Sequence, residues 1–417
     1  MTAPTGTVAA PDVASVPLHT PRDGVPPVVA SAAELTAVVE AFSAGTGPVA
    51  VDAERASGYR YGQRAYLIQL RRRGSGTALI DPIACPELAT LNEVIRQDEW
   101  VLHAANQDLP CLAEVGLTPS TLFDTELAGR LAGHPRVGLG AMVESVLGLT
   151  LEKGHSAADW SRRPLPEPWL RYAALDVEVL IELRDALAAE LGEQGKLAWA
   201  REEFAAIAAT PPPAPRAEAW RRTSGIHRVR SRRQLAAVRA LWETRDDIAR
   251  NRDIAPGRVL PDAAVISAVL AKPRTAAELS RIPVFTGRST RRHLDRWFAA
   301  LASAGALPEE ALPGAVAGGD APPPAHRWAE RDQVAAERLA ASRAAVAAVA
   351  EPLGIPVENL ISPDAIRRLA WRPPDPITIE TVTDGLRERG ARPWQVSLTA
   401  EVIAGALDRP PEDVATE

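Results

Sequence analysis

Two acidic residues two positions apart, Asp52 and Glu54, follow the short apolar run at residues 48–51. In a strand, alternate side chains point to the same face, so the two carboxylates would lie side by side. Like charges this close raise each other's pKa, and a bound cation relieves the repulsion. Carboxylate oxygens are the ligands that Mg²⁺ and Mn²⁺ prefer. The pair therefore predicts the beginning of a divalent-metal site, although an isolated Asp-x-Glu is more often a solvated strand end.

Three later residues could complete such a site. Asp108 follows a short apolar run at the start of a predicted helix, and Tyr172 and Asp176 are four positions apart in another. Residues at this spacing share one helix face. A buried acid needs a partner, and the sequence places no lysine or arginine nearby on the face of Asp176. Alone, Asp108 is typical of a helix start and Tyr172 is typical of a core aromatic. The pattern of all four acids and the tyrosine together is much more specific for a metal site.

The elements that must position these residues form an alternating pattern in the first half of the chain. Strands come first as a meander with a hairpin turn at residues 71–76, and then alternate with helices, which predicts a mixed α/β sheet covered by helices. Ser31 and Glu34 have the spacing of a capping box, and Asp124 is placed to cap a helix. Strands are predicted at residues 48–54, 66–70, 77–80, 100–103 and 122–123, and helices at 31–42, 86–97, 108–115, 139–147, 166–191 and up to 207.

The remaining segments divide the chain into modules. Residues 1–27 are rich in Pro, Ala, Thr and Val without periodicity, which predicts a disordered tail. The α/β domain is predicted at residues 28–209, and the Pro-rich linker at 210–219 predicts few contacts across it. Two helical modules are predicted at residues 220–307 and 326–410, with a second linker at 308–325.

Composition sets limits on the kind of protein. The chain has 417 residues, 46% of them hydrophobic, and only two cysteines, so we expect large cores, no disulfide partner and a reducing compartment. The sequence shows neither a membrane-spanning apolar run nor a secretion signal, and we expect a cytoplasmic protein without a membrane partner.

Charge is distributed unevenly along the chain. The net charge is −6, yet residues 216–252 contain eleven arginines and four acids. This stretch is either a solvated helix face or a surface that contacts a phosphate backbone. The candidate backbone contacts are Arg221, Arg222, Arg228, Arg230, Arg232 and Arg233.

Taken together, Asp52-x-Glu54, Asp108 and Tyr172-x-x-x-Asp176 resemble the DEDD exonuclease superfamily in its tyrosine-bearing branch. The runs Leu122-Phe123-Asp124-Thr125, Lys153 through Asp159-Trp160, Arg163-Pro164-Leu165 and Tyr172 through Val177 are similar to ribonuclease D. Residues 220–307 resemble a helicase-and-ribonuclease-D C-terminal (HRDC) domain, through Gln234-Leu235, Leu241-Trp242, Arg245-Asp246 and Val259 through Asp262. Residues 326–408 resemble the second helical domain of such proteins more weakly. The resemblance implies an α/β ribonuclease H-like exonuclease domain followed by two all-α, HRDC-like domains.

The resemblance also implies an activity, that of a 3′–5′ exoribonuclease that trims RNA 3′ ends and releases nucleoside 5′-monophosphates with two divalent ions, Mg²⁺ or Mn²⁺. Asp52, Glu54 and Asp176 would hold one ion, and Asp52 and Asp108 the other. Tyr172 would orient the attacking water. The expected partners are RNA 3′ ends, namely single-stranded tails and tRNA-like precursors, bound by a monomeric protein.

Some positions depart from the family pattern. Arg55 stands where an aromatic residue is expected, and Ala158 where a serine is expected. Both departures concern substrate contacts, since neither is a proposed metal ligand. Two alternatives remain at this stage: a DNA-directed 3′–5′ exonuclease, and a catalytically inactive nucleic-acid-binding scaffold.

Overall fold

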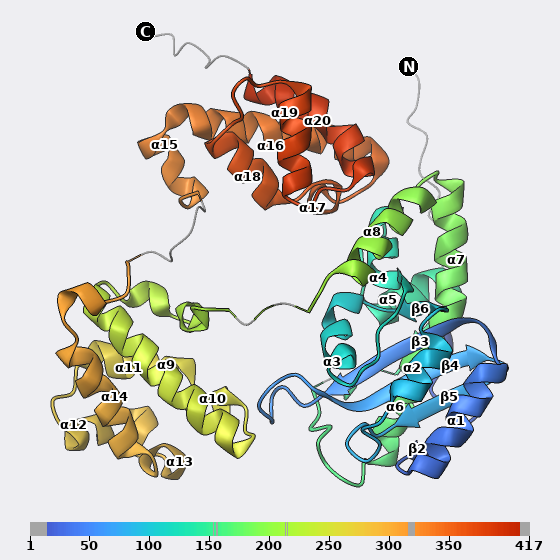
Figure 1. The fold of residues 1–417 in the computed structure, drawn as a ribbon, viewed down its shortest axis with the longest axis horizontal. Coiled ribbons are helices and arrows are strands. Elements are labelled where there is room, and N and C mark those ends of the chain that lie inside the picture. The colour runs from blue at the N-terminus through green and yellow to red at the C-terminus, as the bar shows by residue number, and fades with distance from the viewer. Residues whose placement is uncertain are drawn as a thin grey trace, which may run out of the picture.

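The computed structural model describes residues 15–408 except 153, 156, 213, 215 and 316–321. Lys153, residues 1–14 of the predicted tail, residues 409 and 410, and parts of both predicted linkers therefore lie outside the described residues. The chain forms an α/β domain followed by two helical domains, as the sequence predicts (Figure 1). None of the described helices combines the length and apolar character needed to cross a bilayer.

A mixed six-stranded sheet forms the centre of the α/β domain, in the order β2-β5-β4-β3-β6-β7. The predicted hairpin is formed by β4 and β5, which pair antiparallel, and β4 also pairs antiparallel with β3. On the other side of β3 the sheet continues in parallel, with β6 next to β3 and β7 next to β6. The strands are β2 (Val28–Val29), β3 (Thr46–Arg55), β4 (Ala65–Arg73), β5 (Gly76–Ile80), β6 (Glu99–Leu102) and β7 (Thr121–Asp124). The pair predicted to carry chemistry thus lies at the end of a central strand.

Helices cover this sheet. The Ser31 side chain accepts a hydrogen bond from the Glu34 backbone amide and caps α1, as predicted. The single long helix predicted at residues 166–191 is wrong, because the chain breaks at Val179 into α6, which packs on β3, β4 and β5, and α7, which packs on β3 and β6. The helices are α1 (Ala32–Ala44), α2 (Ala89–Ile95), α3 (Leu109–Glu114), α4 (Thr125–Ala132), α5 (Leu139–Met142) with a π-helical turn (Val143–Leu147), α6 (Glu167–Glu178), α7 (Leu180–Glu193) and α8 (Leu197–Ala209).

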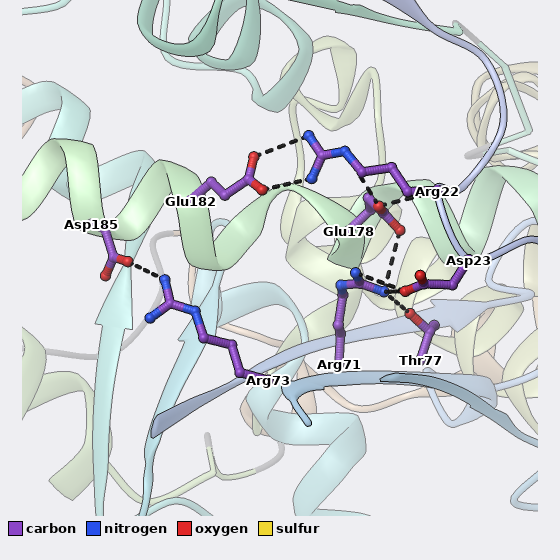
Figure 2. Close-up of polar contacts among 8 residues, drawn as sticks. All are labelled: Arg22, Asp23, Arg71, Arg73, Thr77, Glu178, Glu182 and Asp185. Carbon is purple, nitrogen blue, oxygen red and sulfur yellow. Dashed lines mark hydrogen bonds and ion pairs between the residues drawn. The ribbon is translucent and has the colours of Figure 1, made fainter. Parts of the chain in front are cut away.

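The segment before β2 is ordered from residue 15, which corrects the prediction of a disordered tail over residues 15–27. Strand β1 (Val16–Leu18) pairs in parallel with β8 (Leu149–Leu151). Arg22 forms a 2.6 Å ion pair with Glu182, and Arg71 lies 3.1 Å from Asp23 (Figure 2). Contacts with distant parts of the chain, rather than a local pattern, therefore fix this segment.

The first helical domain is built around the 21-residue helix α9, which begins with a capping box at Ser231 and Gln234. Its core includes the buried side chains of Trp220, Phe285 and Trp297. Residues 309–314, predicted as linker, belong to this domain, since Leu312 is buried against Ala236 and Ala304. The helices are α9 (Arg232–Arg252), α10 (Pro256–Val259), α11 (Asp262–Ala271), α12 (Ala276–Ser280), α13 (Arg288–Arg291) and α14 (Leu294–Ala306).

The second helical domain centres on α16, which packs against α18 and α20. Its helices are α15 (Trp328–Arg331), α16 (Gln333–Leu353), α17 (Val357–Leu360), α18 (Pro363–Trp371), α19 (Ile379–Glu388) and α20 (Pro393–Leu407). Trp394 stacks on Trp199 of α8 with ring centroids 5.2 Å apart, and its indole nitrogen donates to Glu203. This domain is therefore docked on the last helix of the α/β domain.

The first helical domain also contacts the α/β domain, at the loop of residues 56–64 that follows β3. The Tyr61 hydroxyl donates to Asp246 at 3.0 Å, and the Ala255 amide donates to the Tyr59 carbonyl at 3.0 Å. Arg258 donates to the Gly58 carbonyl at 2.7 Å. The prediction of few contacts across the Pro-rich linker is therefore wrong. Linker composition describes the linker itself and carries no information about surfaces that meet elsewhere.

Candidate active site

Strand β3 supplies the first two carboxylates. Asp52 lies opposite Gln69 of β4 and Glu54 opposite Leu67, so both side chains emerge on the same face of the sheet. Glu54 is 7% exposed, whereas Asp52 is half-buried. The neighbouring residues Val49, Ala50 and Val51 are fully enclosed, which explains why this strand keeps its register.

Helix α6 brings Asp176 to the same place. Its carboxylate oxygen lies within 4.8 Å of ligand oxygens from both Asp52 and Glu54, so these three residues form one cluster able to hold a metal ion. Two residues further along, the buried Glu178 lies 3.4 Å from Arg71 of β4, next to the Arg22 contacts (Figure 2). This ion pair ties the end of α6 to the sheet and so sets the position of Asp176.

Tyr172 lies one helical turn before Asp176, as the sequence spacing requires. Its hydroxyl faces the Asp176 carboxylate closely enough for each group to shift the pKa of the other. Burial, followed by the negative charge of Asp176, raises the pKa of Tyr172 far above its usual value, so the hydroxyl stays protonated at neutral pH. The predicted tyrosine therefore lies next to the carboxylate cluster.

Asp108 lies in the same pocket but outside the three-carboxylate cluster. It precedes α3 without capping it, and its Oδ1 is 3.3 Å from the Arg55 guanidinium.

Another acid, Asp124, holds the turn that precedes Asp108. Its carboxylate accepts hydrogen bonds from the backbone amides of Ala104 and Ala105 at 3.0 and 2.9 Å. Ala104 is in the left-handed region with φ 60°. Asp124 also caps α4, as predicted.

The cluster carries uncompensated negative charge. Burial raises the pKa of Asp52 to about 6, and burial together with the charge of Asp52 raises the pKa of Asp108 to about 8. Burial and then the neighbouring carboxylates also raise the pKa values of Glu54 and Asp176 well above their usual range. Four acids that hold their protons this tightly form a site in which a divalent cation would replace the protons.

These carboxylates line a pocket of about 930 Å³, together with Tyr172, Arg55, His103 and Arg136. Burial lowers the pKa of His103 to about 4, so this imidazole is neutral at physiological pH. The four acids and the tyrosine that the sequence predicts for the site all line this pocket. The sequence analysis identified Arg55 only as a departure from the family pattern, because nothing local shows that its side chain reaches Asp108.

The six arginines predicted to contact a nucleic-acid backbone fall into two groups. Arg221, Arg232 and Arg233 donate to carbonyl oxygens of Gly314, Leu312 and Leu307, and so fasten residues 305–314 onto the first helical domain. The other three are exposed, and none of their guanidinium groups has a hydrogen-bond or ion-pair partner among the residues that the structure describes: Arg222, Arg228 and Arg230.

Comparison with known families assigns each domain. Residues 27–192 match the 3′–5′ exonuclease family, residues 234–301 the HRDC domain, and residues 321–407 the 3′ to 5′ exonuclease C-terminal domain. Ribonuclease D of Escherichia coli is 33% identical over 287 residues, which cover 67% of this chain and 74% of that protein. Ribonuclease D of Acidiphilium cryptum is 34% identical over 275 residues, covering 64% and 68% respectively. The match to ribonuclease D of a Shewanella species spans only 58% of that protein.

Solved structures agree with this assignment over nearly the whole chain. A crystal structure of a protein from Bifidobacterium adolescentis has a TM-score of 0.86 at 39% identity and covers 95% of this chain and 100% of that one. The structure of Escherichia coli RNase D, described as an exoribonuclease involved in structured RNA processing, has a TM-score of 0.69 at 28% identity, covering 93% and 99%. This chain therefore belongs to the ribonuclease D family of 3′–5′ exoribonucleases.

Proposed function

We propose that this protein trims RNA 3′ ends one nucleotide at a time, with two divalent ions, Mg²⁺ or Mn²⁺, and releases nucleoside 5′-monophosphates. The observation that carries the proposal is the cluster of Asp52, Glu54 and Asp176, with the Tyr172 hydroxyl beside Asp176. A catalytically inactive scaffold would have no reason to keep this cluster of like charges together.

The donor set fits hard divalent ions, because it consists of carboxylates whose pKa values are raised in the absence of a cation. Asp52, Glu54 and Asp176 would hold one ion, and Asp52 and Asp108 the second. When bound, such ions lower the pKa of an attacking water and neutralise charge on a leaving oxygen.

Tyr172 orients the attacking water and does not act as its base. Because its pKa is raised, the hydroxyl remains a hydrogen-bond donor at neutral pH. A fixed donor beside Asp176 constrains where a water can lie between that carboxylate and a substrate phosphorus. Positioning of this kind contributes to the rate without a proton transfer to the tyrosine.

The substrate we propose is a single-stranded RNA 3′ tail, including the tails of tRNA-like precursors, bound by a monomeric, cytoplasmic protein. The pocket of about 930 Å³ has the size of a site for a small ligand, here a terminal nucleotide. The exposed Arg222, Arg228 and Arg230 are then the preferred candidates for contacts to the RNA backbone, because Arg221, Arg232 and Arg233 already have intramolecular partners.

The experiment is degradation of matched single-stranded RNA and DNA oligonucleotides by the full-length protein, in Mg²⁺, in Mn²⁺ and in EDTA. We expect metal-dependent release of mononucleotides from the 3′ end of RNA. Asp176→Asn should abolish it, whereas Asp185→Asn, a matched change at a half-exposed partner of Arg73, should leave it unchanged. Preferred cleavage of DNA would support the DNA-directed alternative, and retained activity in Asp176→Asn would contradict the assignment of the site.

A further inference from the structure

Among the described residues, Arg55 is the arginine that forms an ion pair with one of the four carboxylates proposed to bind metal. It ends β3 directly after Glu54, where the pairing with β4 shifts register between the two residues. Such a bulge redirects a side chain. The Arg55 side chain lines the pocket, is 25% exposed, and lies 3.3 Å from Asp108, whose side chain is 8% exposed. Burial raises the pKa values of Asp52, Glu54 and Asp108, and the charge of Arg55 offsets part of that rise.

The other basic residues of the pocket cannot take this place. His103 is neutral, because burial lowers its pKa to about 4. The Arg136 side chain is 75% exposed and lies 3.9 Å from Glu144. Arg55 is therefore the one guanidinium, among the described residues lining the pocket, that directly contacts a proposed metal ligand.

Charge balance indicates that the contact with Asp108 is not the only role of Arg55. Four ionised carboxylates balance two divalent ions. The proposed ligands, two such ions and Arg55 would together carry one positive charge in excess, which one phosphodiester would neutralise. A cation bound to Asp108 would also repel the guanidinium that now occupies this carboxylate.

We propose that Arg55 is a phosphate-binding residue of the active site, and that a metal ion bound to Asp108 would release the guanidinium from this carboxylate to the RNA backbone. This inference rests on the proposed exonuclease function and adds a substrate contact to it. The planar guanidinium fork suits two phosphate oxygens in the same way that it suits a carboxylate. The resemblance to ribonuclease D implies an aromatic residue at this position, so the contact would be specific to chains that carry arginine here.

The backbone that follows Arg55 is held in place by the first helical domain. The loop of residues 56–64 is held by the first helical domain, through the hydrogen bonds of Gly58, Tyr59 and Tyr61. A change of Arg55 rotamer can therefore transfer the guanidinium from Asp108 to a phosphate without any movement of the domain.

The test compares Arg55→Gln, which removes the charge, with Arg55→Lys, which keeps the charge but loses the fork. The matched control is Arg73→Gln, because Arg73 also pairs with an aspartate at a strand end but lies outside the pocket. The first measurement is calorimetric titration of the RNA-free, full-length proteins with Mn²⁺. Of the two Mn²⁺-binding events, the weaker one should be about tenfold tighter in Arg55→Gln than in wild type, because the charged contact that competes for Asp108 is removed. Arg73→Gln should match wild type.

The second measurement is the affinity of each protein for a single-stranded RNA oligonucleotide in Ca²⁺, under conditions without cleavage, as a function of salt. Arg55→Gln should bind about tenfold more weakly, and the slope of log affinity against log salt should fall by ~0.7, the value for one lost phosphate contact. Arg55→Lys should keep the wild-type slope. Thermal melting identifies any variant that fails to fold; if Arg55→Gln does, Arg55→Met takes its place as the uncharged variant, and an unchanged slope in that variant contradicts the proposal.

Unchanged RNA affinity and slope in Arg55→Gln would overturn the proposal and leave Arg55 as a structural ion pair with Asp108. Unchanged Mn²⁺ affinity in Arg55→Gln would equally overturn the proposed transfer of the Arg55 guanidinium from Asp108 to a phosphate. Neither measurement requires turnover. A wild-type protein that binds Mn²⁺ and RNA as described but releases no mononucleotide would therefore contradict the proposed function and not the role of Arg55.

Discussion

Replacement of Asp52 by asparagine should make the metal-free protein more heat-stable above about pH 6, although it removes a ligand of the proposed metal site. The two side chains have nearly the same shape, so the packing around β3 should survive. What changes is charge, since the variant cannot ionise next to Glu54 and Asp176, which lie with Asp52 in one cluster.

The magnitude follows from the pKa of Asp52, which burial raises from 3.8 to about 6. The folded protein binds this proton more tightly than the unfolded chain, so its stability falls as the pH rises from 3.8 through about 6, and the full loss persists at higher pH. A difference of about two pKa units corresponds to about 3 kcal/mol. Because Asp52 is only half-buried, we expect about 1–3 kcal/mol, or about 3–10 °C in the melting temperature of a domain of this size.

The assay is thermal unfolding of wild type, Asp52→Asn and the control Asp185→Asn in EDTA at about pH 8 and about pH 5. The gain of Asp52→Asn should be largest at pH 8 and about half as large in free energy at pH 5, whereas Asp185→Asn should show no such pH dependence. Addition of Mn²⁺ should stabilise wild type more than Asp52→Asn, because the variant has lost a ligand. A gain that is the same at both pH values, or a loss of stability at pH 8, would refute the electrostatic explanation.

Three further changes test other parts of the structure. Tyr172→Phe should lower the single-turnover rate by about 10²–10³-fold and leave Mn²⁺ affinity intact, because only the water-orienting hydroxyl is lost; an unchanged rate would make Tyr172 a packing residue. Trp394→Ala removes the ring stacked on Trp199 and should destabilise the docked second helical domain by about 3–5 kcal/mol, visible as faster limited proteolysis before α15, and equal digestion rates would contradict this. Tyr61→Phe should cost about 1 kcal/mol through the lost hydrogen bond to Asp246; a double-mutant cycle with Asp246→Asn that shows no coupling energy would argue against that contact.

The sequence predicted those parts of the site whose placement depends on local periodicity. The strand period placed Asp52 and Glu54 together, the helix period placed Tyr172 beside Asp176, and the cap at Asp124 was recognised from its position before a helix. Contacts distant in sequence were not predictable in this way. The order of residues 15–27 depends on partners such as Glu182, 160 residues away from Arg22. The break at Val179 has no proline or glycine to announce it, and only tertiary packing requires α6 and α7 to take different directions.

The two helical domains contact elements on either side of the Arg55–Asp108 pair. The first holds the loop of residues 56–64, which begins directly after Arg55. The second is docked on α8, which packs against β7, and β7 ends in the Asp124 that fixes the turn before Asp108. Asp52, Glu54 and Asp176, in contrast, are set by β3 and by α6, which is anchored to the sheet within the α/β domain through Glu178 and Arg71. The half of the site that would bind the first ion is therefore positioned by elements of the α/β domain. The half that would bind the second ion and the RNA phosphate lies next to elements that both helical domains contact.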